Sequence, residues 1–180
     1  TSVREYKMVL DICKELFPDY NSKLELIILG RPVNQKGFQI IRQVREHRSN
    51  NHNIHIVDGS GNNKSNDGDF IPDDTFHRVI AESDLLLNPL TASHKQAPGI
   101  PNEIRGTSKG TGIINDSIEN AVPLLVPQEF EVDQAIQTHT HTYRTREDML
   151  SIIKSLANNK SRRDKLRNNA VQNAMKFDLD

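Results

Sequence analysis

The chain has 180 residues, which is enough for one domain with a buried core and short for two. Its formal net charge of -1 argues against a nucleic-acid partner, because proteins that bind nucleic acid usually gather a basic excess on one face. The single cysteine, Cys13, excludes an internal disulfide and a cysteine-based zinc site, and it favours a reducing, cytoplasmic setting. No stretch approaches the roughly 20 apolar residues that span a bilayer. The start at Thr1, without a Met, indicates a fragment of a longer protein or a mature form.

Predicted helices and strands alternate along the chain. Apolar residues recur at helical spacing over residues 3–17, where Pro18 ends the run, and a short apolar block at 24–29 predicts a strand. The same patterns predict, in order, a helix over 38–47, a strand over 53–57, a helix over 76–81, a strand over 84–89, a helix over 114–121 and a strand over 124–126. This alternation predicts a parallel sheet with helices on both faces, an α/β Rossmann-like fold, in a single domain over residues 1–180.

Two helices are predicted to close the chain. Thr145 and Asp148 have the spacing of a capping box in front of an apolar helical period that runs to Leu156. Ser161 and Asp164 have the same spacing in front of a second period that runs to Met175.

The histidines and the cysteine favour structural roles. His139 and His141 are two residues apart and lack a carboxylate partner for a metal site, so a solvated turn is predicted there. His52 and His55 flank a predicted strand, where a histidine with satisfied hydrogen bonds is the default interpretation. Cys13 lies on the apolar side of the first helix and is predicted to be a core residue rather than a nucleophile. No metal site is predicted.

The loop after the strand at 84–89 is the candidate ligand site, because ligands of an open parallel sheet bind beyond the carboxyl ends of its strands. It ends in a polar run at the start of a predicted helix, where free backbone amides and the helix dipole attract phosphate. The residues predicted to bind a donor there offer glycines, hydroxyls and positive charge: Arg105, Ser108, Lys109, Gly110, Thr111 and Gly112. Asp116, about one turn into the helix, is predicted to accept hydrogen bonds from ribose hydroxyls. The run differs from a P-loop, because Lys109 precedes Gly110, which disfavours a kinase or ATPase of that type.

The sequence from residue 111 to residue 126 carries a family resemblance. It reads Thr-Gly-Ile-Ile-Asn-Asp-Ser-Ile-Glu-Asn-Ala-Val-Pro-Leu-Leu-Val, and it resembles the stretch of glycosyltransferase family four with a glycine, an acidic helix, Gly-Val-Pro and an apolar strand. The segment 76–89 is similar to the family's helix and Ala-Asp strand, and the closing helices with Phe177 are similar to its C-terminal pattern. The resemblance covers nearly the whole chain and implies the C-terminal, donor-binding domain of the two-domain GT-B fold.

The chain departs from the family pattern where the sugar is contacted. The family often carries two glutamates eight residues apart, and Ser108 and Asp116 occupy those positions. A subset of the family carries Tyr-Arg followed by Ser-Gly, to which Ile104-Arg105 followed by Thr111-Gly112 is similar. The resemblance therefore supports phosphate and ribose contacts better than the usual sugar contact.

A second basic segment imitates the family's diphosphate-binding motif. Gly30-Arg31 followed by Lys36-Gly37 matches its Arg and Lys, so Arg31 and Lys36 are further candidates for donor binding. A helix precedes this strand, however, which gives the strand the place of the second rather than the first in such a domain.

The resemblance implies a glycosyltransferase of the hexosyltransferase type, which binds a nucleotide-diphosphate sugar and transfers the sugar with retention. The nucleotide sugar is a substrate, no cofactor is expected, and no catalytic residue is assigned. The N-terminal, acceptor-binding domain is expected to be missing, so this chain alone should be inactive; the full-length protein could touch the membrane peripherally. One alternative is a non-catalytic Rossmann-like binding or regulatory module, which Ser108 favours. A nucleotide-sugar epimerase is the other, and it needs carboxylates and a histidine that have no evident counterpart here.

Overall fold

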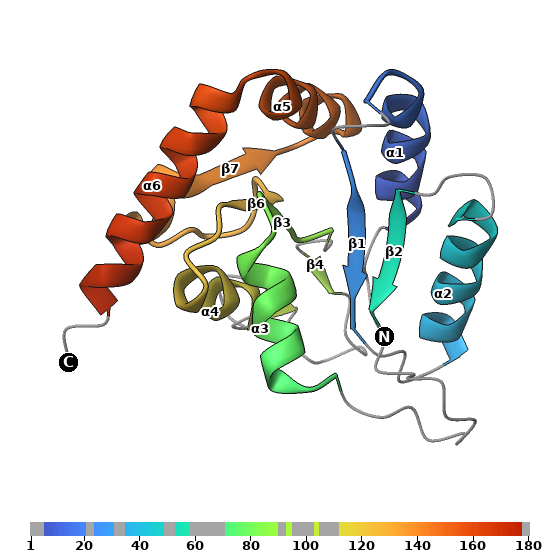
Figure 1. Ribbon diagram of the computed structural model, residues 1–180, viewed down its shortest axis with the longest axis horizontal. Coiled ribbons are helices and arrows are strands. Elements are labelled where there is room, and N and C mark those ends of the chain that lie inside the picture. The colour runs from blue at the N-terminus through green and yellow to red at the C-terminus, as the bar shows by residue number, and fades with distance from the viewer. Residues whose placement is uncertain are drawn as a thin grey trace. The chain divides into compact units, whose positions relative to one another are not determined.

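The computed structural model describes residues 6–20, 24–30, 35–48, 53–57, 71–89, 93–94, 103–104 and 112–177. They pack into two compact units, one within Tyr6–Arg78 and the other within Val79–Asp180 (Figure 1). The single domain expected from the sequence stays a prediction. None of the helices in these ranges combines the length and the apolar character needed to cross a membrane.

The first unit pairs two parallel strands with two helices. Its elements are α1 (Tyr6–Tyr20), β1 (Leu26–Leu29), α2 (Gln35–Arg48) and β2 (Ile54–Val57), followed by the first residues of α3 (Asp73–Ala81). β1 and β2 pair in register from Leu26 opposite Ile54 to Leu29 opposite Val57. The buried side chains of α1 form much of the core: Val9, Leu10, Ile12, Cys13, Leu16 and Phe17.

Helix α1 continues through Pro18 to Tyr20, so the prediction that it ends at Pro18 is wrong. Leu16 and Phe17 are each 1% exposed, and their burial holds the last turn although Pro18 cannot donate a backbone hydrogen bond. Cys13 is 6% exposed, and burial raises the pKa of its thiol to about 12. The prediction of a core cysteine is confirmed.

A three-stranded parallel sheet forms the centre of the second unit, in the order β3 (Leu86–Leu87), β6 (Leu124–Pro127), β7 (Thr140–Tyr143). All four residues of β6 are buried, as expected for the central strand of a parallel sheet. The other elements are β4 (Ser93–His94) and β5 (Glu103–Ile104), which pair antiparallel, α4 (Gly112–Glu119), the 3-10 helix η1 (Gln134–His139), α5 (Arg146–Asn158) and α6 (Lys160–Phe177).

The segment around His139 and His141 is ordered differently from the prediction. η1 ends at His139, and β7 pairs with β6 from Thr140 opposite Leu124 to Tyr143 opposite Pro127. His139 is 1% exposed. The predicted solvated turn is therefore wrong, because pairing with a buried strand draws this polar segment into the sheet.

The turn between α4 and β6 contains a residue in the left-handed region. Ala121 has φ 50°, a conformation that costs a residue with a Cβ atom about 1–2 kcal/mol and that glycine adopts freely. The family stretch that this segment resembles has Gly-Val-Pro where this chain has Ala121-Val122-Pro123.

The capping box predicted for α5 is confirmed. Thr145 Oγ1 accepts from the Asp148 amide at 3.1 Å, and the Asp148 carboxylate accepts from the Thr145 amide at 3.0 Å. These bonds, with one from the Arg144 amide, lower the pKa of Asp148 below its usual range.

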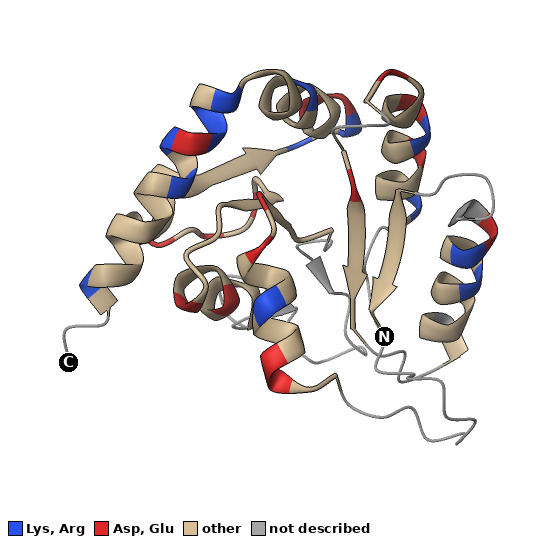
Figure 2. Cartoon of the chain, viewed as in Figure 1, with Lys and Arg blue, Asp and Glu red and all other residues tan. Residues whose placement is uncertain are grey.

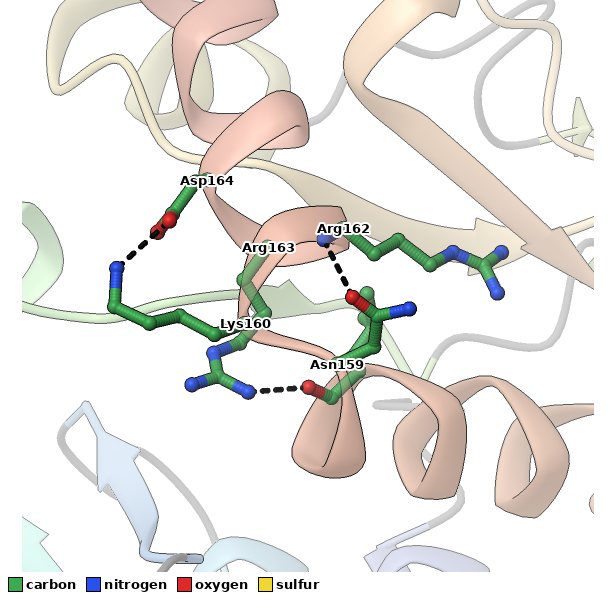
Figure 3. A network of polar contacts seen from close by, with 6 residues as sticks. Asn159, Lys160, Arg162, Arg163 and Asp164 are labelled. Atoms are coloured by element: carbon green, nitrogen blue, oxygen red, sulfur yellow. Dashed lines mark hydrogen bonds and ion pairs between the residues drawn. The ribbon is translucent and has the colours of Figure 1, made fainter.

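The cap predicted for α6 is wrong. Figure 3 shows Asn159 Oδ1 accepting from the Arg162 amide at 2.9 Å, while Asp164 binds Lys160 Nζ at 2.7 Å. Asparagine caps a helix as well as serine does. Because Asn159 stands two residues before Ser161, α6 begins two residues earlier than predicted, at Lys160. Most of the charged residues of α6 lie in its first half (Figure 2), where Arg163 donates to the Leu156 and Ala157 carbonyls at the end of α5.

Candidate functional site

Two of the predicted donor-binding residues, Gly112 and Asp116, lie in the described part of the chain, both on α4. The backbone of Lys36 lies in the first turn of α2, and its side chain is outside the described set. The remaining predicted residues lie outside the described residues: Arg31, Arg105, Ser108, Lys109, Gly110 and Thr111. The candidate site is therefore built from α4 and the elements that hold it.

Helix α4 brings Gly112 and Asp116 together. Gly112 is exposed and is the first helical residue, and a Cβ atom placed on it would lie 3.9 Å from Asp116 Oδ2. That distance is ordinary contact, so packing within the protein would accept a larger residue than glycine here. The spacing of one helical turn places the Asp116 carboxylate beside the start of the helix, as the sequence predicts.

The start of α4 lies at the carboxyl edge of the parallel sheet, which is the edge where ligands of such sheets bind. β3, β6 and β7 run parallel, so their carboxyl ends share one edge. The chain leaves β3 at that edge and enters β6 at the opposite edge, with α4 as the last helix between them. The first turn of α4 consequently faces the carboxyl edge, where N–H groups that have no partner within the helix and the positive end of its dipole favour an anion.

Apolar packing fixes the first turn of α4 on the sheet. Ile113 and Ile114 pack against a buried cluster formed by Leu124, Val126 and Phe130. Leu124 and Val126 are both 0% exposed, so this contact is part of the core of the second unit. The helix start is thus held on a rigid element.

A buried polar network fixes the other end of α4. Ser117 Oγ donates to the Val122 carbonyl at 2.6 Å and lies 3.3 Å from His139 Nε2. On the other side of the ring, Asn173 Nδ2 lies 2.9 Å from His139 Nδ1. Lys176 Nζ donates to Asn173 Oδ1 at 3.0 Å. Ser117, His139 and Asn173 are 0%, 1% and 4% exposed, so the network joins α4, η1 and α6 inside the core.

The directions of these bonds define the state of His139. Asn173 Nδ2 is a donor, so His139 Nδ1 accepts, and the proton of the neutral ring is on Nε2, from where it is donated to Ser117 Oγ. A second proton on Nδ1 would face the Asn173 amide hydrogens. Burial lowers the pKa of His139, which agrees with a neutral ring.

This Ser-His-Asn group differs from a hydrolase triad. A nucleophilic serine donates its proton to the histidine, whereas Ser117 Oγ donates to a backbone carbonyl and is fully buried. The group therefore acts as a structural lock. Thr140, Thr142 and Tyr143 are residue types common in strands, but the segment lacks the apolar alternation that predicts one, so the sequence alone does not place His139 beside the sheet.

Asn88, at the carboxyl end of β3, is a candidate that sequence reasoning missed. It is 4% exposed, and its backbone N–H extends the β3–β6 ladder by donating to the Leu125 carbonyl at 3.0 Å. In the described ranges, Asn88 Nδ2 is a buried side-chain donor that has no hydrogen-bond partner. A pattern of residue types carries no signal for an unpaired atom, because pairing depends on the tertiary structure.

No three His, Cys, Asp or Glu side chains of the described ranges lie together as a group that could hold a metal ion.

Comparisons with known proteins relate the fold to one solved complex. No protein-family model matches the chain, and no curated protein matches its sequence. The chain is similar to HepE from Anabaena, whose crystal structure was determined in complex with UDP, with a TM-score of 0.61 and 10% sequence identity. The match covers 98% of this chain and 42% of HepE, so the chain spans less than half the length of that protein. At this identity the likeness concerns the fold, and it confirms the predicted α/β Rossmann-like class.

Proposed function

We propose that this chain is the donor-binding half of a GT-B glycosyltransferase that resembles family four, and that it binds a nucleoside-diphosphate sugar at the first turn of α4. The observation that carries the proposal is the fold match to HepE, which was solved with UDP bound, over 98% of this chain. The position of Gly112 and Asp116 on one helix at the carboxyl edge of the parallel sheet supports it independently.

The chemistry at this edge suits a diphosphate. The dipole and the N–H groups without a partner inside the helix at the start of α4 favour negative charge, and Arg105 and Lys109 in the preceding run add two cations. Asp116 is half-buried beside the helix start, a position from which a carboxylate can accept from ribose hydroxyls. Ser108 and Thr111 would add hydroxyl contacts.

Transfer of the sugar would depend on positioning and on stabilisation of the leaving diphosphate. The core contacts of Ile113 and Ile114 and the network around His139 hold α4 in place, which supports a preorganised site. The resemblance implies retention of configuration. Since the chain spans 42% of HepE, the acceptor-binding part would lie in a further domain, and this chain alone should bind nucleotide without turnover.

Calorimetric titration with UDP, GDP and ADP tests the donor site. The double variant Arg105→Ala/Lys109→Ala should lose about 2 kcal/mol or more of nucleotide affinity, because hydrogen bonds to charged groups are each worth about 1.5–3 kcal/mol. A matched control, Arg42→Ala/Lys160→Ala, removes the same two charges from exposed ion pairs with Glu46 and Asp164 and should bind as the wild type does.

Equal binding by the wild type and the Arg105→Ala/Lys109→Ala variant would contradict the assignment of the cations. Binding of nucleotide without any transfer by the full-length protein would instead favour the non-catalytic module.

A further inference from the structure

The side-chain amide of Asn88 is an unusual donor in the second unit. Asn88 is 4% exposed, and Nδ2 is buried without a hydrogen-bond partner in the part of the chain that the structure describes. The buried polar side chains Ser117, His139 and Asn173 all have such partners. An unpaired buried donor is unfavourable, so its presence at the carboxyl edge of the sheet calls for a functional explanation.

The backbone of Asn88 is fixed on both sides. Its N–H donates to the Leu125 carbonyl at 3.0 Å, and its own carbonyl accepts from Tyr143 Oη at 3.1 Å. Tyr143 is 5% exposed, so the second bond is also in the core. The backbone of Asn88 is therefore fixed relative to β6 and β7.

Strand alternation places the amide on the α4 side of the sheet. Leu86 packs against the cluster of Leu124, Val126 and Phe130, which Ile113 and Ile114 of α4 also contact. Residues two apart in a strand point to the same face. β3 ends at Leu87, but the Asn88 N–H continues its ladder to the Leu125 carbonyl, so the alternation extends to Asn88 and puts its side chain on the face that the first turn of α4 covers.

The first turn of α4 and the side-chain amide of Asn88 both present hydrogen-bond donors. The first turn of α4 offers N–H groups that have no partner within the helix and the positive end of a dipole, and Asn88 offers an amide N–H. Together they suit an acceptor that carries negative charge, which is the chemistry of a phosphate oxygen. We infer that Asn88 is a ligand-binding residue whose amide, with the start of α4, donates to a diphosphate oxygen of the nucleotide. This inference rests on the proposed function and adds a residue to its site.

The variant Asn88→Leu tests the inference because it keeps the approximate volume and removes the donor. We expect UDP affinity to fall at least about tenfold, the effect of losing one hydrogen bond to a charged group. The ligand-free variant should unfold at the same or a higher urea concentration, since it no longer buries an unpaired amide. Asn169→Leu is the matched control, because the Asn169 amide is exposed and already bonded to the Thr138 carbonyl; it should bind UDP as the wild type does.

The outcomes separate the two proposals. If the wild type binds UDP and Asn88→Leu binds it equally well, the inference on Asn88 is wrong and the proposed function stands. If the wild type binds none of UDP, GDP and ADP, the proposed function fails and the inference fails with it.

A measurement on the wild type covers the case in which Asn88→Leu does not fold. The side-chain amide resonance of Asn88, followed by NMR, should shift on addition of UDP and stay in place on addition of uridine, which lacks the diphosphate. An unchanged resonance while the backbone amides of Gly112 and Ile113 shift with UDP would overturn the inference, and so would an equal shift with uridine.

Discussion

His139 and Asn88 are both buried polar residues of the second unit, and they differ in hydrogen bonding. Both ring nitrogens of His139 have partners, Ser117 at 3.3 Å and Asn173 at 2.9 Å. Asn88 Nδ2 has none among the described residues, although Asn88 is also buried, at 4% exposure against 1% for His139.

This difference in hydrogen bonding indicates different roles for the two residues. A fully bonded buried network stabilises one arrangement of the elements it joins, here α4, η1 and α6. An unpaired buried donor destabilises the ligand-free protein, and it gains a hydrogen-bond partner when an acceptor enters. We therefore assign His139 to the support of α4 and Asn88 to the ligand.

Removal of the histidine should have the largest effect on stability. His139→Ala deletes a ring that is 1% exposed and removes one hydrogen-bond partner each from the buried Ser117 and Asn173, so we expect a loss of about 3 kcal/mol in the free energy of unfolding. Urea denaturation measures it. The exposed His77 of α3 provides the control, since His77→Ala should change stability by less than about 0.5 kcal/mol. If His139→Ala lowers the free energy of unfolding by an equally small amount, the network does not stabilise the packing of α4.

The pH dependence of stability should report the same network. Burial lowers the pKa of His139 in the folded state, so below the ordinary histidine pKa of about 6.5 the unfolded chain binds a proton that the folded chain excludes. Stability should be full above that pH and should fall with decreasing pH, by at most about 1.4 kcal/mol per pH unit for one group.

In His139→Gln, the free energy of unfolding should depend less on pH than in the wild type. Urea denaturation at neutral and at mildly acidic pH measures this difference. His141, whose pKa is lowered by burial and by Arg162, contributes in the same direction, so His141→Gln is the companion variant. If the free energy of unfolding of both variants depends on pH as strongly as that of the wild type, the neutral state of these rings is contradicted.

Asn88→Leu should have the opposite sign from His139→Ala in the ligand-free protein. Burial of an unpaired polar group costs about 1–3 kcal/mol, and replacement by an apolar side chain of similar volume removes that cost, so we expect a gain of up to about 1 kcal/mol. Urea denaturation without nucleotide measures it. A clear loss of stability would indicate that the Asn88 amide has a hydrogen-bond partner in the folded protein. Asn88 would then not differ from His139 in hydrogen bonding.

A stabilising effect of similar size to that of Asn88→Leu is expected at Ala121. Ala121→Gly relieves the left-handed φ of 50° while it leaves the Ser117 bond to the Val122 carbonyl intact. The gain is reduced by the greater freedom of glycine in the unfolded chain, so the net stabilisation should be about 0.5–1 kcal/mol in thermal or urea unfolding. Destabilisation would show that the turn adopts another conformation.

The sequence could predict much of the fold because the apolar residues are periodic. Strand and helix patterns placed β1, β2, β6 and the helices between them, and the fold match confirms the α/β class. The position of Gly112 at the start of α4, with Asp116 one turn later, also follows from local pattern alone.

The parts that were missed depend on contacts between distant segments. Thr140–Tyr143 is polar, and it forms a strand because β6 offers a buried edge to pair with. His139 becomes a core residue through Ser117 and Asn173, which are 22 and 34 residues away. Asn88 is a candidate because its amide lacks a partner, which is a property of the folded chain rather than of the residue type.

Titration of the intact chain with UDP, GDP and ADP, followed by calorimetry, tests the central claim most directly. We expect at least one of these nucleotides to bind at a single site and Arg105→Ala/Lys109→Ala to weaken that binding strongly. Absence of binding by all three at millimolar concentration, with circular dichroism showing a folded protein, would contradict a nucleotide-sugar site in this chain.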